Sequence, residues 1–190
     1  MGIYSVIDHR AWKVLQNVAA DFSSFAAIEG ISNNRIKLDG GKLGIVDLQA
    51  SYRIINKWMG RVYVYTWSWA LPDPSLPDDM KITCRYTGTW KSPKTVQFVS
   101  KQPSPLLEAL NRDEKIQKLC QTVDYEAIEL SYSKREGRWQ VEMRPNYGDF
   151  IWILLPPVRY ARRPKQQEIT DTMTLINRLT KLITQRSKEV

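Results

Sequence analysis

The sequence predicts an α+β fold in which an antiparallel sheet packs against about three helices. Three observations support this prediction: an amphipathic helix opens the chain, β-hairpins follow with few helices between them, and another amphipathic helix closes the chain. We expect this C-terminal helix to pack on the sheet. The length of 190 residues suits one domain, residues 1–190. Hydrophobic residues at 43% and aromatic residues at 11% are enough for a full core.

The first half is expected to contain one helix followed by strands. The helix carries an apolar stripe at spacings of three and four, formed by Trp12, Leu15, Ala19, Phe22 and Ala26. The turn Asp39-Gly40-Gly41 indicates a hairpin after a short strand. Period-two alternation then predicts strands, in the order 35–38, 45–56, 61–69, 81–87 and 95–100.

The second half is expected to repeat the order of helix, linker and hairpin. Ser104 followed by Pro105 is typical of a helix start, and Asp113 can cap a continuation. Strands are predicted at 127–133, 138–144 and 150–155, and the closing helix at about 168–185. The repeated order suggests duplication of a helix–hairpin unit over residues 8–100 and 104–186; chance recurrence in an α+β fold is the alternative.

Four large rings alternate along one face of the strand at 61–69: Tyr63, Tyr65, Trp67 and Trp69. Pairing of Asn56 with Arg61 would place Ala50 opposite Trp67, so that the rings share a face with apolar residues and form core. A one-residue slip would place the rings beside polar residues. We expect core, because the rings are a large area to leave in water. A ligand pocket or a stacking platform lined by these rings is the alternative.

The stretch "FIWILLPPVRYARRPK", residues 150–165, changes from apolar to basic. Residues 150–155 have the length of a buried strand, which Pro156-Pro157 would end. The following basic residues lie on the connection into the last helix, whose free N–H groups could help them hold a phosphate or carboxylate: Arg159, Arg162, Arg163 and Lys165. A solvated basic loop is the alternative.

The segment "RPNYGD", residues 144–149, is a further candidate. Asn, Gly and Asp favour tight turns, and Arg144 and Tyr147 offer polar groups for a functional loop. A plain hairpin turn is the alternative. The net charge of +8 and the pI near 9.5 favour nucleic acid or another anionic partner.

Composition and spacing exclude several classes. Cys84 and Cys120 are too few for a zinc site and are interpreted as free thiols of a cytoplasmic protein, and we expect neither a metal nor a cofactor. No secretory signal is recognised, and the longest apolar run is too short to span a membrane. We do not expect peripheral membrane contact, because the required exposed wedge would need Trp152 to lie at a sheet edge.

Catalytic patterns are scarce. His9 is the single histidine, and phosphate-binding glycine motifs are absent, so we do not expect a hydrolase, kinase or dehydrogenase of a common type. We nominate no catalytic residue, although a cleft of convergent carboxylates would be invisible in the sequence. Three hypotheses remain: a non-enzymatic module that binds an anionic partner at the basic loop, a small-molecule or lipid carrier with an aromatic pocket, and a protein-interaction domain without a ligand.

Overall fold

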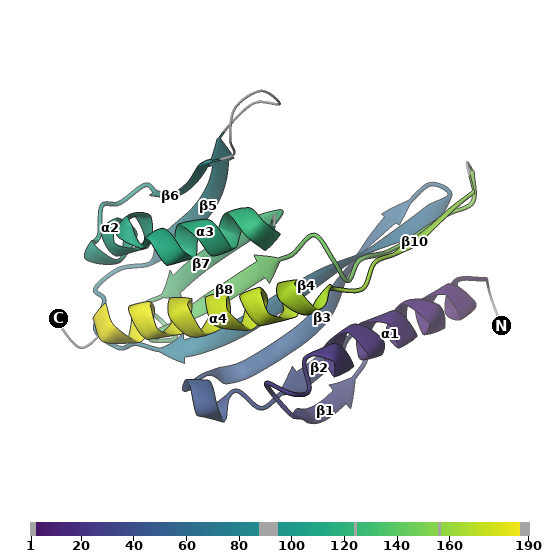
Figure 1. The fold of residues 1–190 in the computed structure, drawn as a ribbon, viewed down its shortest axis with the longest axis horizontal. Coiled ribbons are helices and arrows are strands. Elements are labelled where there is room, and N and C mark those ends of the chain that lie inside the picture. Colours follow the sequence, from purple (N-terminus) through teal and green to yellow (C-terminus); the bar gives the residue numbers. More distant parts are fainter. Residues whose placement is uncertain (1–2, 88–94, 124, 156, 187–190) are drawn as a thin grey trace.

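One antiparallel sheet and four helices make up the part of the chain that the computed structural model describes, residues 3–87, 95–123, 125–155 and 157–186. The α+β prediction is confirmed. The helices lie on one side of the sheet (Figure 1) and are α1 (Ile3–Asp21), α2 (Pro105–Arg112), α3 (Glu114–Val123) and α4 (Gln166–Arg186). The strands are β1 (Ile28–Ser32), β2 (Arg35–Leu38), β3 (Val46–Lys57), β4 (Gly60–Pro72), β5 (Met80–Thr87), β6 (Thr95–Ser100), β7 (Ala127–Ser133), β8 (Arg138–Arg144), β9 (Phe150–Ile153) and β10 (Val158–Ala161).

The sheet mixes strands from both halves of the chain. Its order is β1-β2-β3-β4-β8-β7-β5-β6, so β7 and β8 lie between β4 and β5. The strand β9 pairs with the other end of β4, and β10 pairs with β9. The duplication of residues 8–100 and 104–186 stays a prediction.

Two strands, β1 and β10, were not predicted. The sequence predicts a connecting loop for the residues of β10, but they pair with β9 from Val158 opposite Ile153 to Ala161 opposite Phe150. The predicted strand at 150–155 ends earlier, at Ile153. Pro156 lies outside the described residues.

The segment 145–149 is not a hairpin turn. Both β8 and β9 run antiparallel to the same strand, β4, with Met143 opposite Trp67 and Phe150 opposite Tyr63. The segment therefore interrupts what would otherwise be one long strand along this edge of β4.

The register of the β3–β4 hairpin confirms the pairing expected for a core. Asn56 pairs with Arg61, Tyr52 with Tyr65 and Ala50 with Trp67. Because alternate residues of a strand point to opposite faces, the rings of β4 point toward the helices. The other face of the sheet carries the polar residues of β3, β4 and β8, and we call it the open face.

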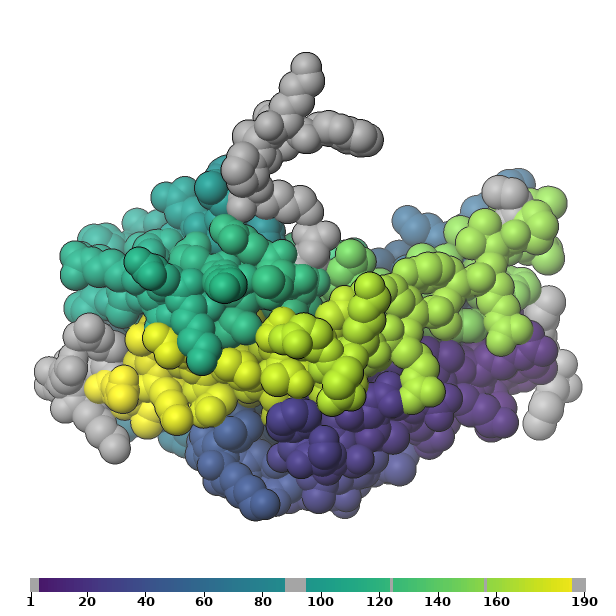
Figure 2. All heavy atoms as spheres, viewed as in Figure 1, coloured from purple at the N-terminus to yellow at the C-terminus, as the bar shows by residue number. Residues whose placement is uncertain are grey.

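The core lies between the sheet and the helices, which cover it as Figure 2 shows. The apolar face of α4 lies in it, formed by Ile169, Met173, Ile176, Leu179 and Ile183. The first helix ends at Asp21, so Phe22 and Ala26 follow it, yet both are buried. No helix among the described residues is both long and apolar enough to cross a membrane.

Candidate functional site

Two of the four basic residues after β9, Arg162 and Arg163, are already paired with carboxylates. Arg162 forms an ion pair with Glu168 and donates a 2.6 Å hydrogen bond to the carbonyl of Asn146. Arg163 forms an ion pair with Asp21 at the end of α1, and this hydrogen-bonded carboxylate raises the pKa of the guanidinium. These two arginines therefore fasten the connection to different parts of the fold.

The N-terminus of α4 already holds a carboxylate. Glu168 accepts a 2.7 Å hydrogen bond from the backbone N–H of Lys165, as the third residue of a capping box does. The same carboxylate pairs with Arg162. An external anion would have to compete with Glu168 for this helix end, whereas the exposed side chains of Arg159 and Lys165 form no ion pair with any residue that the structure describes.

The aromatic rings of β4 are packed in the core. Tyr63, Tyr65, Trp67 and Trp69 are fully buried. The centroid of Trp67 lies 4.8 Å from that of Phe22 and 5.7 Å from that of Tyr65, both in edge-to-face geometry. These rings fill space between sheet and helices.

Tyr147 belongs to a buried chain of hydrogen bonds. Its hydroxyl accepts a 3.2 Å bond from Nε1 of Trp67 and lies 2.9 Å from Oγ1 of Thr172, which in turn accepts a 3.1 Å bond from the hydroxyl of Tyr125. Burial raises the pKa of the Tyr147 phenol. This side chain holds the interrupted edge of β4 to α4 and does not reach solvent.

Arg144, the other candidate of this segment, lies on the open face with two further arginines. A hollow of about 450 Å³ is lined there by Arg35 of β2, Arg53 of β3 and Arg144 of β8. We call this space the arginine hollow. Its other lining residues are mostly uncharged and polar: Gln49, Ser51, Tyr52, Thr66, Ser68, Gln140 and Glu142.

The strand register explains why these groups converge. Arg35 pairs with Ser51, so the two side chains point to the same face, and Arg53 follows two residues later on that face. Across β4, Ser68 joins Gln49 to Glu142, and Arg144 follows Glu142 two residues later. Three strands thus present a guanidinium from the same side of the sheet.

The guanidinium groups of the hollow are available for a ligand. None of the three forms a hydrogen bond or ion pair with another residue within the described ranges, and Glu142 is the acidic residue among those lining the hollow. Arginine binds phosphate and carboxylate through two parallel N–H groups, and the hydroxyl and amide groups beside it can donate further hydrogen bonds. The arrangement fits an anion with several oxygens.

Asp149 borders this region on the interrupted edge. Its Oδ1 accepts a 2.7 Å hydrogen bond from the backbone N–H of Tyr65, at the point where β4 has lost its strand partner. Burial raises the pKa of Asp149 to about 6, and Glu126 adds to the shift, while the Tyr65 N–H and Arg144 oppose it.

Stability should therefore depend on the charge of Asp149. The folded state favours the protonated form of Asp149. The contribution of this residue to the free energy of unfolding is therefore fully present below about pH 4 and declines as pH rises through about 6. Asp149→Asn keeps an oxygen for the Tyr65 N–H but cannot ionise. We expect the difference in free energy of unfolding between Asp149→Asn and wild type to shift by about 1 kcal/mol in favour of the variant between about pH 4 and pH 8. This value allows for screening of the half-exposed carboxylate. Urea unfolding across this range checks it, and parallel pH profiles would contradict it.

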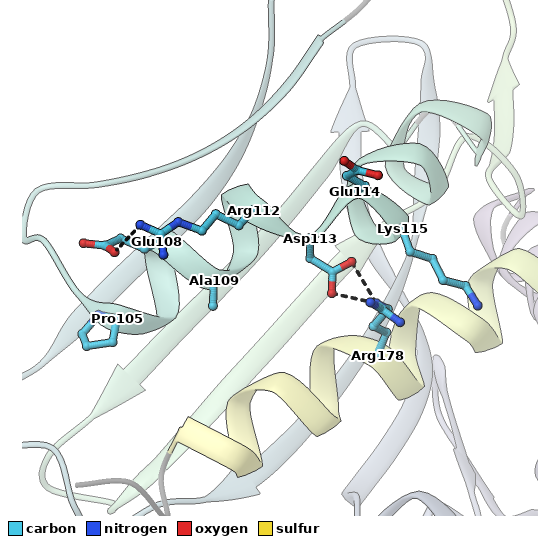
Figure 3. Close-up of a pocket in the computed structure, with 8 residues that line it drawn as sticks. All are labelled: Pro105, Glu108, Ala109, Arg112, Asp113, Glu114, Lys115 and Arg178. Atoms are coloured by element: carbon cyan, nitrogen blue, oxygen red, sulfur yellow. Dashed lines mark hydrogen bonds and ion pairs between the residues drawn. The ribbon is translucent and has the colours of Figure 1, made fainter.

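A second hollow, of about 700 Å³, lies between α2, α3 and α4 (Figure 3). Its charges are largely paired. Arg178 donates to both oxygens of Asp113 at 2.9 and 2.7 Å, and Arg112 pairs with Glu108 at 3.2 Å. Asp113 also caps α3 by accepting the N–H of Ile116. These groups stabilise the helix junction and leave less free charge than the arginine hollow.

A third hollow, of about 710 Å³, lies farther along the open face, over β5, β6 and β7. There Lys81 pairs with Glu129 at 2.6 Å, which neutralises one of its basic groups. Within the described ranges no group of three or more His, Cys, Asp or Glu side chains could hold a metal ion. Cys84 and Cys120 are free, buried thiols.

Comparison with known protein families identifies the family to which the chain belongs. Residues 20–183 match the model of a family described as a protein of unknown function, DUF3156. The chain belongs to the DUF3156 family. The matched part contains the whole sheet, the arginine hollow and nearly all of α4, but little of α1. No curated protein and no solved structure is detectably similar to the chain.

Sequence reasoning singled out Arg144 but missed Arg35 and Arg53. The alternation of β3 did contain a signal, because Gln49, Ser51 and Arg53 form its polar face. The neighbour that completes the site, β8, comes from the other half of the chain, and its place beside β4 is visible only in the fold.

Proposed function

We propose that this protein is a non-enzymatic binding module for a phosphate-bearing anion, which it binds in the arginine hollow. The observation that carries the proposal is the convergence of Arg35, Arg53 and Arg144 on one polar space, where none of the three guanidinium groups forms an ion pair with a described residue and the nearby carboxylates are those of Glu142 and Asp149. A solvent-open surface of guanidinium, hydroxyl and amide groups suits an extended or multiply charged anion.

The other two candidate sites support binding less well. In the basic loop, Arg162 and Arg163 are already neutralised by Glu168 and Asp21. The aromatic residues proposed for a carrier pocket pack against one another and against Phe22. Tyr52, the aromatic residue of the arginine hollow, is buried and donates a 2.6 Å hydrogen bond to the carbonyl of Gly148.

The kind of ligand follows from these groups. Single-stranded nucleic acid is usually held by exposed rings on which the bases stack, and the residues lining the hollow offer arginines instead. We therefore expect recognition of phosphate groups with little selectivity for a base. A nucleic acid would then be bound through its backbone alone.

Calorimetric titration with inorganic tripolyphosphate, and band shifts with a mixed-sequence oligonucleotide at low salt, test the proposal. We expect Arg53→Glu/Arg144→Glu to weaken binding of tripolyphosphate by at least about tenfold, because charged hydrogen bonds are replaced by repulsion. Binding should also weaken steeply with salt.

Two charge-matched controls locate the site. Lys118→Glu/Lys181→Glu makes the same change in net charge at exposed positions on α3 and α4, and should bind as wild type does. Arg159→Glu/Lys165→Glu probes the basic loop. If Arg159→Glu/Lys165→Glu loses binding while Arg53→Glu/Arg144→Glu retains it, the anion binds at the basic loop. If these two variants and Lys118→Glu/Lys181→Glu lose binding equally, the effect is one of net charge alone.

A further inference from the structure

The ends of two hairpins form an exposed apolar tip. Trp58, in the turn between β3 and β4, is 93% exposed, and Leu154 and Leu155, after β9, are 47% and 63% exposed. The N–H of Leu154 donates a 2.8 Å hydrogen bond to the carbonyl of Met59, which holds the two ends together. Figure 1 shows both hairpins projecting side by side, away from α2, α3 and α4.

The apolar surface continues from this tip onto the open face. Ile55 pairs with Val62, Val62 with Ile151, and Ile151 with Tyr160, so one row of apolar side chains crosses β3, β4, β9 and β10. Tyr160 is 45% exposed. In Figure 2 the β9–β10 hairpin reaches outward with β3 and β4 behind it. A clustered apolar surface of this kind marks an interaction site, whereas single exposed residues need no explanation.

Basic residues predominate around the tip. Residues 48–72 and 150–167, which include the projecting ends of both hairpins, contain seven Lys and Arg residues and no Asp or Glu; Asp47, at the far end of β3, pairs with Lys37 at 3.3 Å. Three of the seven are paired with acids from α1 and α4: Arg61 with Asp8, Arg163 with Asp21, and Arg162 with Glu168. The other four form no ion pair with a described residue, and they are Arg53, Lys57, Arg159 and Lys165.

The combination of an exposed apolar surface with positive charge indicates the kind of partner that the tip binds. A second copy that docked through its own tip would bring two basic surfaces together, which repel each other. A bilayer that contains anionic lipids offers negative charge beside an apolar layer, and amphipathic surfaces with a tryptophan and basic residues bind there. Arg53 lies two residues from Ile55 on the same face of β3, so the arginine hollow and the apolar surface would meet the bilayer together.

We infer that the tip formed by Trp58, Leu154 and Leu155 inserts into the headgroup region of a membrane rich in anionic phospholipids, while the arginine hollow binds lipid phosphates. The headgroup contact rests on the proposed function; the insertion of the tip rests on its exposure and charge. This apolar wedge differs from the one centred on Trp152 that the sequence would require. Trp152 is half-buried within β9, which is covered by β10 at the sheet edge, and Trp58 and Leu155 provide the exposed apolar groups instead.

Sedimentation with vesicles tests the inference. We expect wild type to bind phosphatidylcholine vesicles that contain phosphatidylserine, and to bind pure phosphatidylcholine more weakly. Trp58→Ser/Leu155→Ser should reduce binding by at least about tenfold, since it removes most of the inserted apolar area. Phe25→Ser/Ile31→Ser, which removes exposed apolar side chains near β1, is the matched control and should bind as wild type does.

Acyl-chain quenching reports insertion directly. Brominated lipids should quench part of the tryptophan fluorescence of wild type, and Trp58→Phe should lose that quenching. Binding of vesicles without quenching would overturn insertion of the tip.

Different experimental results would overturn the membrane inference and the proposed function. If wild type binds tripolyphosphate but no vesicles, the membrane inference is overturned and the proposed function stands. If vesicles are bound through the tip but neither tripolyphosphate nor Arg53→Glu/Arg144→Glu has an effect, the proposed function is overturned. If no vesicles are bound and a concentration-dependent dimer is lost in Trp58→Ser/Leu155→Ser, the tip binds a second copy and the inference is wrong.

Discussion

Replacement of Gly148 by alanine is expected to destabilise the protein by about 3–5 kcal/mol. Gly148 has φ +87°, a conformation that is strained for any residue with a side chain, at about 1–3 kcal/mol. An added Cβ would also lie 2.6 Å from Cγ and 2.8 Å from Cδ2 of Tyr65. The ring of Tyr65 is fully buried, so relieving the overlap would disturb the core, at a further cost of about 1–3 kcal/mol.

Gly137→Ala is the matched control for this prediction. Gly137 also has a positive φ, +59°, but the nearest foreign atom to its added Cβ is the Cα of Pro74, at 3.8 Å. It should therefore cost only the backbone strain, about 1–2 kcal/mol. Urea unfolding of the two variants measures the difference. Equal costs would mean that the close approach of Gly148 to Tyr65 is wrong.

Loss of the Asp73 carboxylate is the second large effect that we expect. Asp73 is 2% exposed and lies just after β4. Its Oδ1 accepts bonds from the N–H of Ser75 at 3.0 Å and from its hydroxyl at 2.5 Å, and its Oδ2 accepts a 3.1 Å bond from Nε1 of Trp139. Asp73→Ala would leave the buried indole N–H without a partner, and we expect a loss of about 3 kcal/mol.

Two further variants separate the causes. Asp73→Asn keeps one acceptor oxygen and should cost less than Asp73→Ala, because one of the two hydrogen-bonded sides is preserved. Ser75→Ala removes a donor from the same carboxylate at a half-exposed position and should cost about 1 kcal/mol. Thermal and urea unfolding give these values. If the free energy of unfolding of Asp73→Ala lies within about 0.5 kcal/mol of the wild-type value, the carboxylate does not stabilise the segment that follows β4.

Much of the fold could be predicted from local patterns. The strands β7 and β8 have the predicted bounds, because their alternation is clean and a glycine-containing turn joins them. The register of β3 and β4 followed from matching the apolar residues of one strand with the rings of the other. In these elements the local pattern and the tertiary environment favour the same structure.

Other elements depend on partners that are distant in the sequence. The residues of β10 resemble a loop, since all four side chains are exposed, and they become a strand by pairing with β9. The segment 145–149 has the composition of a turn, yet β4 holds the strands on both sides of it. No local signal distinguishes these structures from the simpler alternatives.

The candidate site was hard to predict for the same reason. Arg162 and Arg163 belong to a conspicuous basic run, but their acidic partners include Asp21, which is 142 positions away from Arg163. Arg35, Arg53 and Arg144 come from three separate segments and are brought together by the order of the strands. A conspicuous run of charge therefore includes residues that are paired elsewhere in the fold, while charges scattered along the sequence converge on one face of the sheet.

An NMR titration with inorganic tripolyphosphate would show where on the protein the anion binds. We record backbone amide and arginine Nε–H signals while the anion is added at low salt. We expect saturable shifts at Arg35, Arg53 and Arg144 and at the strand residues between them, with little change at residues 159–165. Shifts confined to residues 159–165, or none that saturate, would contradict binding of an anion on the open face of the sheet.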